Sequence, residues 1–309
     1  MRKFLLFLYP LLLAGCALPP AGPNLPGEAA IVPLRSERPL VALALGSGGA
    51  RGFAHIGVIK ALEDAGIEPD IVTGSSSGAI VAALYAGGRR ARELEEIALA
   101  LGKSDLVDFA LFGKGWVRGA ALQDFVNRMV DERPIERLAK PLAVVATQAN
   151  NRRMTVFNRG DTGLAVRASA SVPNLFVPPV INGEEYVDGG LTSPVPVKLA
   201  RAMGADVVIA VDVSWFAQAR NGTGDGMARY GRSVRYQLLT DELDAADFVI
   251  VPLMARTRLL DFEKREANIA AGEEAGRSAV LQLRETIARI SAAKQARRSA
   301  SAAQGNRQD

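Results

Sequence analysis

The stretch Ile71-Val-Thr-Gly-Ser-Ser-Ser-Gly-Ala-Ile-Val-Ala-Ala-Leu-Tyr-Ala-Gly-Gly88 decides the fold of this chain. A short β-branched run stops at Gly74, and a run of small residues with helical character begins after Ser76. A strand that passes directly into a helix is the unit from which parallel α/β sheets are built. The pattern therefore predicts a strand, a sharp turn that contains Ser76, and a helix.

The turn itself, Gly74-Ser-Ser-Ser-Gly78, fits the pattern G-x-S-x-G with Ser76 at its centre. A serine in a sharp strand-to-helix turn has a strained backbone, and small neighbours allow its Oγ to project into a cleft. The following helix directs its N-terminal N–H groups towards negative charge that forms there. A connecting loop rich in glycine and serine would show the same five residues, so the motif alone leaves a nucleophile and a plain loop open.

A second glycine-rich turn precedes this one. Residues 40–45 are continuously apolar, as in a strand buried on both faces, and Gly46-Ser-Gly-Gly-Ala-Arg-Gly52 follows. A dinucleotide fingerprint would need glycine in place of Arg51, and a phosphate loop would need Gly-Lys-Ser/Thr at its end. What remains is a nest of backbone N–H groups suited to an oxyanion. Right-handed crossovers would bring both turns to the carboxyl edge of one sheet.

The histidine count restricts the mechanism. A serine hydroxyl needs a base to become a nucleophile, and α/β-hydrolases use a histidine that follows the serine in the chain. The only histidine is His55, which precedes Ser76. It lies one turn into the helix after the glycine-rich turn, where we expect it to bond backbone or a helix neighbour, although it stays an alternative base. A carboxylate is the main candidate, and Asp188, followed by two glycines at the end of a short strand, is the best placed; an ordinary turn residue is the alternative.

Further elements follow from periodicity and composition. Helices are expected near residues 89–100, 120–130, 194–203 and 262–290, strands near 141–146, 154–157, 205–213 and 247–251, and an ordered loop over 168–180. Residues 105–119 contain Phe109 and Trp116 between glycines and are either a lid or acyl-chain surface, or a small apolar core under a loop. Residues 291–309 are polar and low in complexity, which predicts disorder; their basic side chains could contact anionic lipid or remain solvated.

The N-terminus has the layout of a signal peptide. Arg2 and Lys3 precede a short apolar run, and Leu13-Ala-Gly-Cys16 resembles the bacterial lipobox, in which the cysteine is lipidated. Residues 1–15 would then be removed, and residues 16–39, with six prolines from position 17 onward, would form an extended tether. An ordinary secretory leader with an incidental cysteine is the alternative. Ala17, which is not aspartate, favours the outer membrane by resemblance to enterobacterial sorting.

Composition excludes several partners and sites. Without Arg2 and Lys3, 35 of the 37 basic residues remain against 33 acidic ones, so the chain is nearly neutral and we expect no nucleic-acid partner. Cys16 is the only cysteine, which rules out an intramolecular disulfide and a cysteine-based metal site. With one histidine as well, no zinc cluster is expected, and neither a metal nor a cofactor is predicted.

Three motifs in this order resemble those of the patatin-like phospholipases, a group of Ser–Asp dyad lipid acyl hydrolases that includes the catalytic domain of neuropathy target esterase. The motifs are Gly46-Ser-Gly-Gly-Ala-Arg-Gly52, Gly74-Ser-Ser-Ser-Gly78 and Asp188-Gly-Gly190. The resemblance extends over residues 40–213. The chain departs from it at Ser47, where many members have glycine.

The resemblance implies a three-layer α/β/α sandwich with a mostly parallel central sheet over residues 40–255, followed by a C-terminal helix and tail over 256–309. It implies that Ser76 attacks an ester carbonyl while Asp188 accepts the proton, and that the N–H groups of Gly48, Gly49 and Ala50 form the oxyanion hole. Arg51 would face a lipid head group or brace the loop. We expect phospholipid or another acyl ester as substrate, and a protein anchored through Cys16 in the bacterial cell envelope, on the periplasmic face of the outer membrane.

Two alternatives to a lipid acyl hydrolase stay open from the sequence. One is a short-chain carboxylesterase or peptidase that uses the same dyad. The other is a lipid-anchored binding protein that keeps the fold without turnover, against which the intact Ser76 and Asp188 argue.

Overall fold

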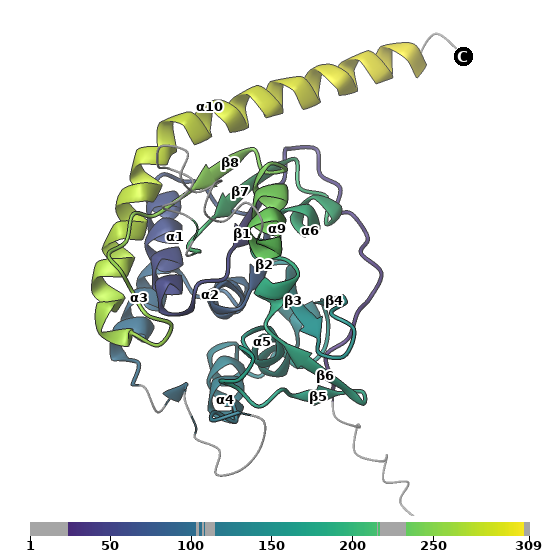
Figure 1. Ribbon diagram of the computed structural model, residues 1–309. Helices are drawn as coiled ribbons and strands as arrows, with labels where there is room; N and C mark the ends of the chain where they lie inside the picture. The colour runs from purple at the N-terminus through teal and green to yellow at the C-terminus, as the bar shows by residue number, and fades with distance from the viewer. Residues whose placement is uncertain are drawn as a thin grey trace, which may run out of the picture.

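A mixed sheet of eight strands forms the centre of the molecule (Figure 1). The computed structural model describes residues 24–102, 105–106, 108, 115–214, 216 and 233–305. The strands are β1 (Val41–Leu45), β2 (Ile71–Ser75), β3 (Leu142–Gln148), β4 (Met154–Phe157), β5 (Val180–Ile181), β6 (Glu184–Val187), β7 (Val207–Val211) and β8 (Phe248–Ile250). Their order is β5-β6-β3-β2-β1-β7-β8, with β4 also paired to β3.

Five neighbouring strands, β3-β2-β1-β7-β8, run parallel, and β4, β5 and β6 add antiparallel pairs at one edge. The parallel strands are mostly apolar because both of their faces are covered, and the polar side chains of β2 and β3, such as Thr73 and Thr147, are buried. In β1, Leu43 and Leu45 belong to the core on one face of the sheet, whereas Ala42 and Ala44 belong to the core on the other. The β strands thus separate two apolar layers.

Helices form the outer layers. They are α1 (Ala54–Asp64), α2 (Ser77–Ala86), α3 (Ala91–Ala100), α4 (Ala120–Met129), α5 (Thr162–Ser169), α6 (Val197–Ala202), α9 (Val234–Leu243) and α10 (Arg265–Gly305), with short 3₁₀ turns η1 (Gly49–Phe53), η3 (Ile135–Arg137), η4 (Gly189–Leu191) and η5 (Phe262–Lys264). The core residues of α6 and α9 lie on one face of the sheet and those of α1, α2, α3, α4, α5 and α10 on the other. The predicted α/β fold with its mostly parallel sheet is confirmed.

The C-terminal helix α10 is longer than the sequence pattern predicts. It starts beside α1, and its yellow end projects past the other elements in Figure 1. The predicted disorder from residue 291 is wrong up to residue 305, because α10 continues through this alanine-rich, basic segment. Such residues favour helix, and the Lys294 Nζ donates to Asp206 Oδ2 at 2.7 Å, which ties the helix to the start of β7. Residues 306–309 lie outside the described part.

The described part of the predicted tether, residues 24–39, runs against the domain. The Leu34 N–H donates to the Met203 carbonyl at 2.9 Å, and Gly27 forms an isolated bridge with Arg159. The predicted signal peptide and Cys16 lie outside the described residues. None of the described helices has both the length and the apolar character that a bilayer span requires.

Candidate active site

Ser76 occupies the sharp turn between β2 and α2, and its backbone lies in a region that non-glycine residues rarely adopt (φ 55°, ψ −124°). Such a conformation costs about 1–3 kcal/mol and persists only where the surroundings impose it. The glycines of the motif make the turn sterically feasible. A Cβ on Gly78 would lie 2.2 Å from the Leu45 carbonyl oxygen, and one on Gly74 would lie 2.6 Å from Ala79 Cα. The Ser76 N–H donates to Ser169 Oγ at 2.8 Å, which holds the turn from α5.

The Ser76 hydroxyl donates to Asp188 Oδ2 at 2.6 Å, although 112 positions separate the two residues in the sequence. Asp188 follows β6 and precedes η4, and its other carboxyl oxygen, Oδ1, accepts the Gly190 N–H at 2.8 Å. Its backbone is fixed as well, because its N–H donates to the Ser171 carbonyl and its carbonyl accepts the Thr147 hydroxyl. The carboxylate is therefore held in place from both ends.

Both members of this pair are buried: Ser76 is 6% exposed and Asp188 is 5% exposed. Burial raises the pKa of Asp188, because a charged carboxylate is poorly solvated there, while the hydrogen bonds from Ser76 and Gly190 and the charge of Arg235 oppose the rise. A carboxylate with a raised pKa is a stronger base than an exposed one. The pair thus has the geometry and the basicity for proton transfer from serine to aspartate.

His55 does not reach this pair by any hydrogen bond in the described structure. Its ring is fully buried, and Nε2 lies 2.8 Å from the Gly46 carbonyl oxygen, so Nε2 carries the proton and donates. Burial lowers the pKa of His55 to about 4, which keeps the ring neutral. The expectation that this histidine bonds backbone is confirmed, and its role is to tie α1 to the glycine-rich turn.

The glycine-rich turn lies beside Ser76, but its N–H groups are not equivalent. The Gly48 N–H donates to Ser77 Oγ at 3.1 Å, and the Ala50 N–H donates to the Leu259 carbonyl at 2.8 Å. Within the described part of the chain, the Gly49 N–H has no acceptor. Gly49 has φ +60°, and a Cβ there would lie 2.5 Å from Leu259 Cδ1, so both conformation and space require glycine. The Gly49 donor is therefore open, and that of Ala50 is already used.

Arg51 is 5% exposed, which places it inside the protein and not at the surface. Burial lowers its pKa to about 10, the negative charge of Asp212 acts in the opposite direction, and the positive charge of Arg235 lowers the pKa further. Asp212 follows β7, so this attraction links the glycine-rich turn to the next strand of the sheet. Its burial and its attraction to Asp212 favour Arg51 as a brace for the loop.

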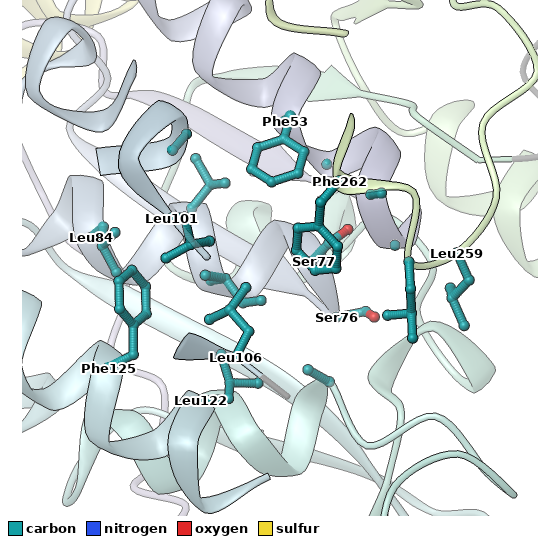
Figure 2. A pocket seen from close by; sticks show the side chains of 18 of the residues that line it. Phe53, Ser76, Ser77, Leu84, Leu101, Leu106, Leu122, Phe125, Leu259 and Phe262 are labelled. Carbon is teal, nitrogen blue, oxygen red and sulfur yellow. The ribbon is translucent and has the colours of Figure 1, made fainter. Parts of the chain in front are cut away.

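An apolar pocket of about 950 Å³, counted with its open mouth, extends from Ser76. In Figure 2, the Ser76 and Ser77 hydroxyls are the oxygen atoms among hydrocarbon side chains, with Leu259 at the right of the view and Leu84 and Phe125 at the end of the pocket away from Ser76. Further lining residues from η1, α2, α3, α4, η5 and the loops include Phe53, Ile80, Leu94, Leu106, Leu122, Leu175, Phe176 and Phe262. The pocket offers its occupant almost only carbon, as a fatty acyl chain requires.

Residues 105–119 were expected to form either a lid or acyl-chain surface or a small apolar core, and residues 107 and 109–114 of this segment, Phe109 included, lie outside the described residues. Of its described members, Leu106 lines the pocket, whereas Trp116 is 70% exposed. In the described segments, no three His, Cys, Asp or Glu side chains gather where a metal ion could bind.

The sequence profile of the patatin-like phospholipases matches residues 43–201. The chain belongs to the patatin-like phospholipase family. An uncharacterized NTE family protein of Mycobacterium tuberculosis is 37% identical over 66% of this chain and 56% of its own length. Patatin-like phospholipase domain-containing protein 6 of Homo sapiens is 36% identical over 70% of this chain and 16% of its own length. This chain thus spans little more than half, or less, of these relatives.

The fold is also shared with a solved structure. VipD from Legionella pneumophila superimposes with a TM-score of 0.54 over 84% of this chain and 70% of its own, at 15% identity. At that identity the likeness concerns the fold alone.

Part of this patatin-like site lies beyond the segment that the family profile matches and was not predicted from the sequence. Leu259, Leu260 and Phe262, which follow β8, line the pocket, and Asn268 in α10 donates from Nδ2 to the Ala50 carbonyl at 3.1 Å. The predicted boundary at residue 255 assigned these residues to a separate extension. Their apolar character was the only signal, and it is shared with any core residue.

Proposed function

We propose that this chain is a serine acyl hydrolase that cleaves carboxylic esters of lipids, as a phospholipase A or lysophospholipase does. The observation that carries the proposal is the 2.6 Å hydrogen bond between Ser76 Oγ and Asp188 Oδ2 at the wall of an apolar pocket. Membership of a family of lipid acyl hydrolases supports it. A base, a nucleophile and a site for an acyl chain are the parts that such hydrolysis needs.

In the first half of the reaction, Asp188 accepts the proton as Ser76 Oγ attacks the ester carbonyl carbon. The Gly49 N–H donates to the oxyanion. The Gly48 N–H becomes a second donor to the oxyanion once its hydrogen bond to the Ser77 hydroxyl breaks. The Ala50 N–H, which Leu259 holds, is not part of this proposed hole. Loss of one such donor typically raises the barrier by about 2.7–4 kcal/mol. When the intermediate collapses, the C–O bond to the alcohol breaks and Asp188 returns the proton to the leaving oxygen.

In the second half, water attacks the acyl-serine and gives its proton to Asp188. The Ser76 oxygen leaves and regains that proton, and the fatty acid is released. The apolar pocket holds the acyl chain through both halves. Every proton transfer in this scheme uses the same carboxylate, which suits a site in which His55 is neutral and bonded to backbone.

We also propose that Cys16 carries a lipid and that the enzyme acts in the bacterial cell envelope, on the periplasmic face of the outer membrane. The lipobox-like sequence 13–16 supports this proposal. A lipid anchor would hold the pocket near ester substrates that reside in a membrane.

A fluorophosphonate probe and a panel of esters test the proposed activity. We expect the probe to label wild-type protein at Ser76 and not the Ser76→Ala variant, and we expect diacyl or lyso phospholipids to be cleaved faster than butyrate esters. Faster cleavage of butyrate esters would favour a short-chain carboxylesterase. Absence of labelling in folded protein would favour a binding protein without turnover.

A further inference from the structure

Arg235 lies beside the active site but has no part in the reaction described above. It is in the first turn of α9 and is exposed, and its Nη2 donates to Ser47 Oγ at 3.4 Å. Ser47 lies in the glycine-rich turn and is 2% exposed. Its hydroxyl gives this turn a contact with a guanidinium that a glycine could not make.

Ser47 is also adjacent to the turn that carries the base. A Cβ on Gly190 would lie 2.6 Å from Ser47 Oγ and 2.9 Å from Asp188 Oδ1, so both oxygens lie close to the same point beside Gly190. The Ser47 N–H donates to the Pro194 carbonyl at 2.8 Å, which fixes its backbone. The contact with Ser47 thus directs the Arg235 guanidinium to the Asp188 side of the Ser76–Asp188 pair.

The charge of Arg235 acts on the site. It lowers the pKa of Asp188 and, by repulsion between like charges, that of Arg51. Because Asp212 already offsets the charge of Arg51, the exposed guanidinium of Arg235 is the cation that can attract an anionic group at this side of the site. Arginine also matches phosphate oxygens with paired N–H donors.

The orientation of a bound lipid ester determines where its anionic group would lie. When the ester carbonyl lies at Ser76 and the acyl chain fills the apolar pocket, the alcohol part must leave on another side. Neither Ser47 nor Arg235 is among the residues that line the apolar pocket. The alcohol part of a phospholipid or lysophospholipid carries the phosphate, so the phosphate would lie where a cation is needed.

We propose that Arg235, positioned by Ser47, is a subsite for the phosphate on the alcohol side of the lipid ester. This inference rests on the proposed hydrolase function and narrows its substrate class to phosphate-bearing lipids. Arg235 acts by binding and not in the chemical step.

Equilibrium binding in the Ser76→Ala background tests the subsite without turnover. Two ligands share the ester and the acyl chain: 1-oleoyl lysophosphatidic acid carries a phosphate, and monooleoylglycerol does not. We expect Arg235→Gln to weaken binding of the phosphate-bearing lipid about tenfold or more relative to that of the neutral lipid, as measured by titration calorimetry, because a hydrogen bond between charged groups is lost. Arg235→Lys should retain part of the preference.

Arg137→Gln is the matched control, because Arg137 is an exposed arginine in η3, which precedes β3 and so lies at the amino edge of the sheet. It should leave both affinities unchanged. Equal weakening of both ligands by Arg235→Gln, or a change below twofold for the phosphate-bearing lipid, would overturn the subsite. Saturable binding of inorganic phosphate that is at least as tight as that of the phosphate-bearing lipid, and that Arg235→Gln removes, would also overturn it, by assigning the site to free phosphate.

Turnover of the same two lipids separates this inference from the proposed function. In otherwise wild-type protein, Arg235→Gln should lower the ratio of kcat/KM for the phosphate-bearing ester to that for the neutral ester about tenfold, mainly through KM. If wild-type protein cleaved neither lipid, the hydrolase proposal would fail, while the binding experiment would still decide the subsite.

Discussion

At the residue scale, the site depends on how one buried carboxylate is solvated. Asp188 accepts hydrogen bonds from Ser76 and Gly190, yet its burial is the largest influence on its pKa. This burial makes the carboxylate more basic, because a charged carboxylate is poorly solvated there. In the proposed mechanism, the raised pKa of Asp188 takes the place of the histidine base of other serine hydrolases.

Removal of either member of the pair should abolish the reaction. We expect Ser76→Ala and Asp188→Asn each to lower kcat about a thousandfold or more, because nucleophile and base act as a unit. Hydrolysis of a p-nitrophenyl octanoate ester measures this, with the melting temperature as a check on folding. Asp64→Asn, which changes an exposed carboxylate of α1, is the control and should be neutral. Full activity in Asp188→Asn would contradict the mechanism and bring His55 back as a candidate base.

The pH dependence follows from the raised pKa of Asp188. Only the deprotonated carboxylate accepts the Ser76 proton, so kcat/KM should fall on acidification with a midpoint above the ordinary aspartate value of about 3.9. Because the positive charge of Arg235 lowers this pKa, Arg235→Gln should move the midpoint to higher pH. A midpoint at or below the ordinary value in the wild-type rate profile would refute the assignment of Asp188 as the base.

The same shift has a consequence for stability. A folded-state pKa above the unfolded value means that the folded protein binds more protons between the two values, so stability decreases as pH rises through that window. The Asp188→Asn variant lacks this effect, because asparagine does not titrate. The melting temperature of the variant minus that of wild type should therefore increase as the pH is raised from acidic to neutral.

At the scale of elements, the close packing of α1 against α10 supports the glycine-rich turn of the site. A Cβ on Gly272 would lie 1.9 Å from the Ala54 carbonyl oxygen, and one on Gly57 would lie 1.9 Å from the Ile269 carbonyl oxygen. The two helices can approach this closely only because glycine stands at both positions. Asn268, in the same turns of α10, then reaches the Ala50 carbonyl of the glycine-rich turn.

Gly272→Ala tests this contact. Alanine normally stabilises a helix interior by about 0.5–1 kcal/mol relative to glycine. Here overpacking against α1 should cost about 1–3 kcal/mol and reverse the sign, so the free energy of unfolding in urea should fall. Ala270→Gly, at an exposed position of α10, measures the propensity alone. An increase in stability on Gly272→Ala would show that α1 and α10 are not in close contact.

The length of the pocket along α2 should set the preferred acyl chain. Leu84 is eight residues after Ser76, about 12 Å along the helix, and lines the end of the pocket away from it. Leu84→Trp should lower the ratio of kcat/KM for palmitoyl to that for butyryl esters at least tenfold, since each excluded CH₂ forfeits about 0.8 kcal/mol of burial. Leu281→Trp, at a position of α10 that is 70% exposed, is the control. An unchanged ratio would mean that the acyl chain binds elsewhere.

At the scale of the whole molecule, the described residues 24–39 join the folded domain to the segment that contains Cys16. Residues 24–39 lie along the domain, so a lipid on Cys16 would be only a short segment away from the folded protein. Such an arrangement would keep the pocket close to a bilayer surface. The anchor remains a proposal that rests on the sequence.

Cys16→Ser tests the anchor. We expect this variant to leave the membrane fraction and to lose incorporation of an alkyne-labelled fatty acid, because Cys16 is the only cysteine. The Ser76→Ala variant, whose N-terminus is intact, should stay in the membrane fraction and keep the label. Unchanged fractionation and labelling of Cys16→Ser would remove the lipoprotein proposal.

The sequence by itself determined the strand-to-helix turns, the sheet class and the pairing of Ser76 with Asp188. The turns and the sheet class depend on short-range constraints, such as glycine where no Cβ fits and continuously apolar strands. The pairing follows from the absence of a histidine after the serine and from the resemblance of the three motifs to those of the family. The sequence pattern did not predict helix α5 or the continuation of α10 past residue 290, because weakly apolar segments show little hydrophobic periodicity.

Only the tertiary structure decided which N–H donors of the glycine-rich turn lack an acceptor among the described residues. It also decided that Leu259, Leu260 and Phe262 line the pocket and that Arg235 contacts Ser47. Each of these contacts joins segments far apart in the chain, and the contact with Leu259 consumes the Ala50 donor that the motif appeared to offer. The local sequence determines which interactions a residue is chemically able to make. The packing of distant elements fixes which partner it has, because hydrogen-bond donors and apolar surfaces accept any complementary neighbour that the fold brings to them.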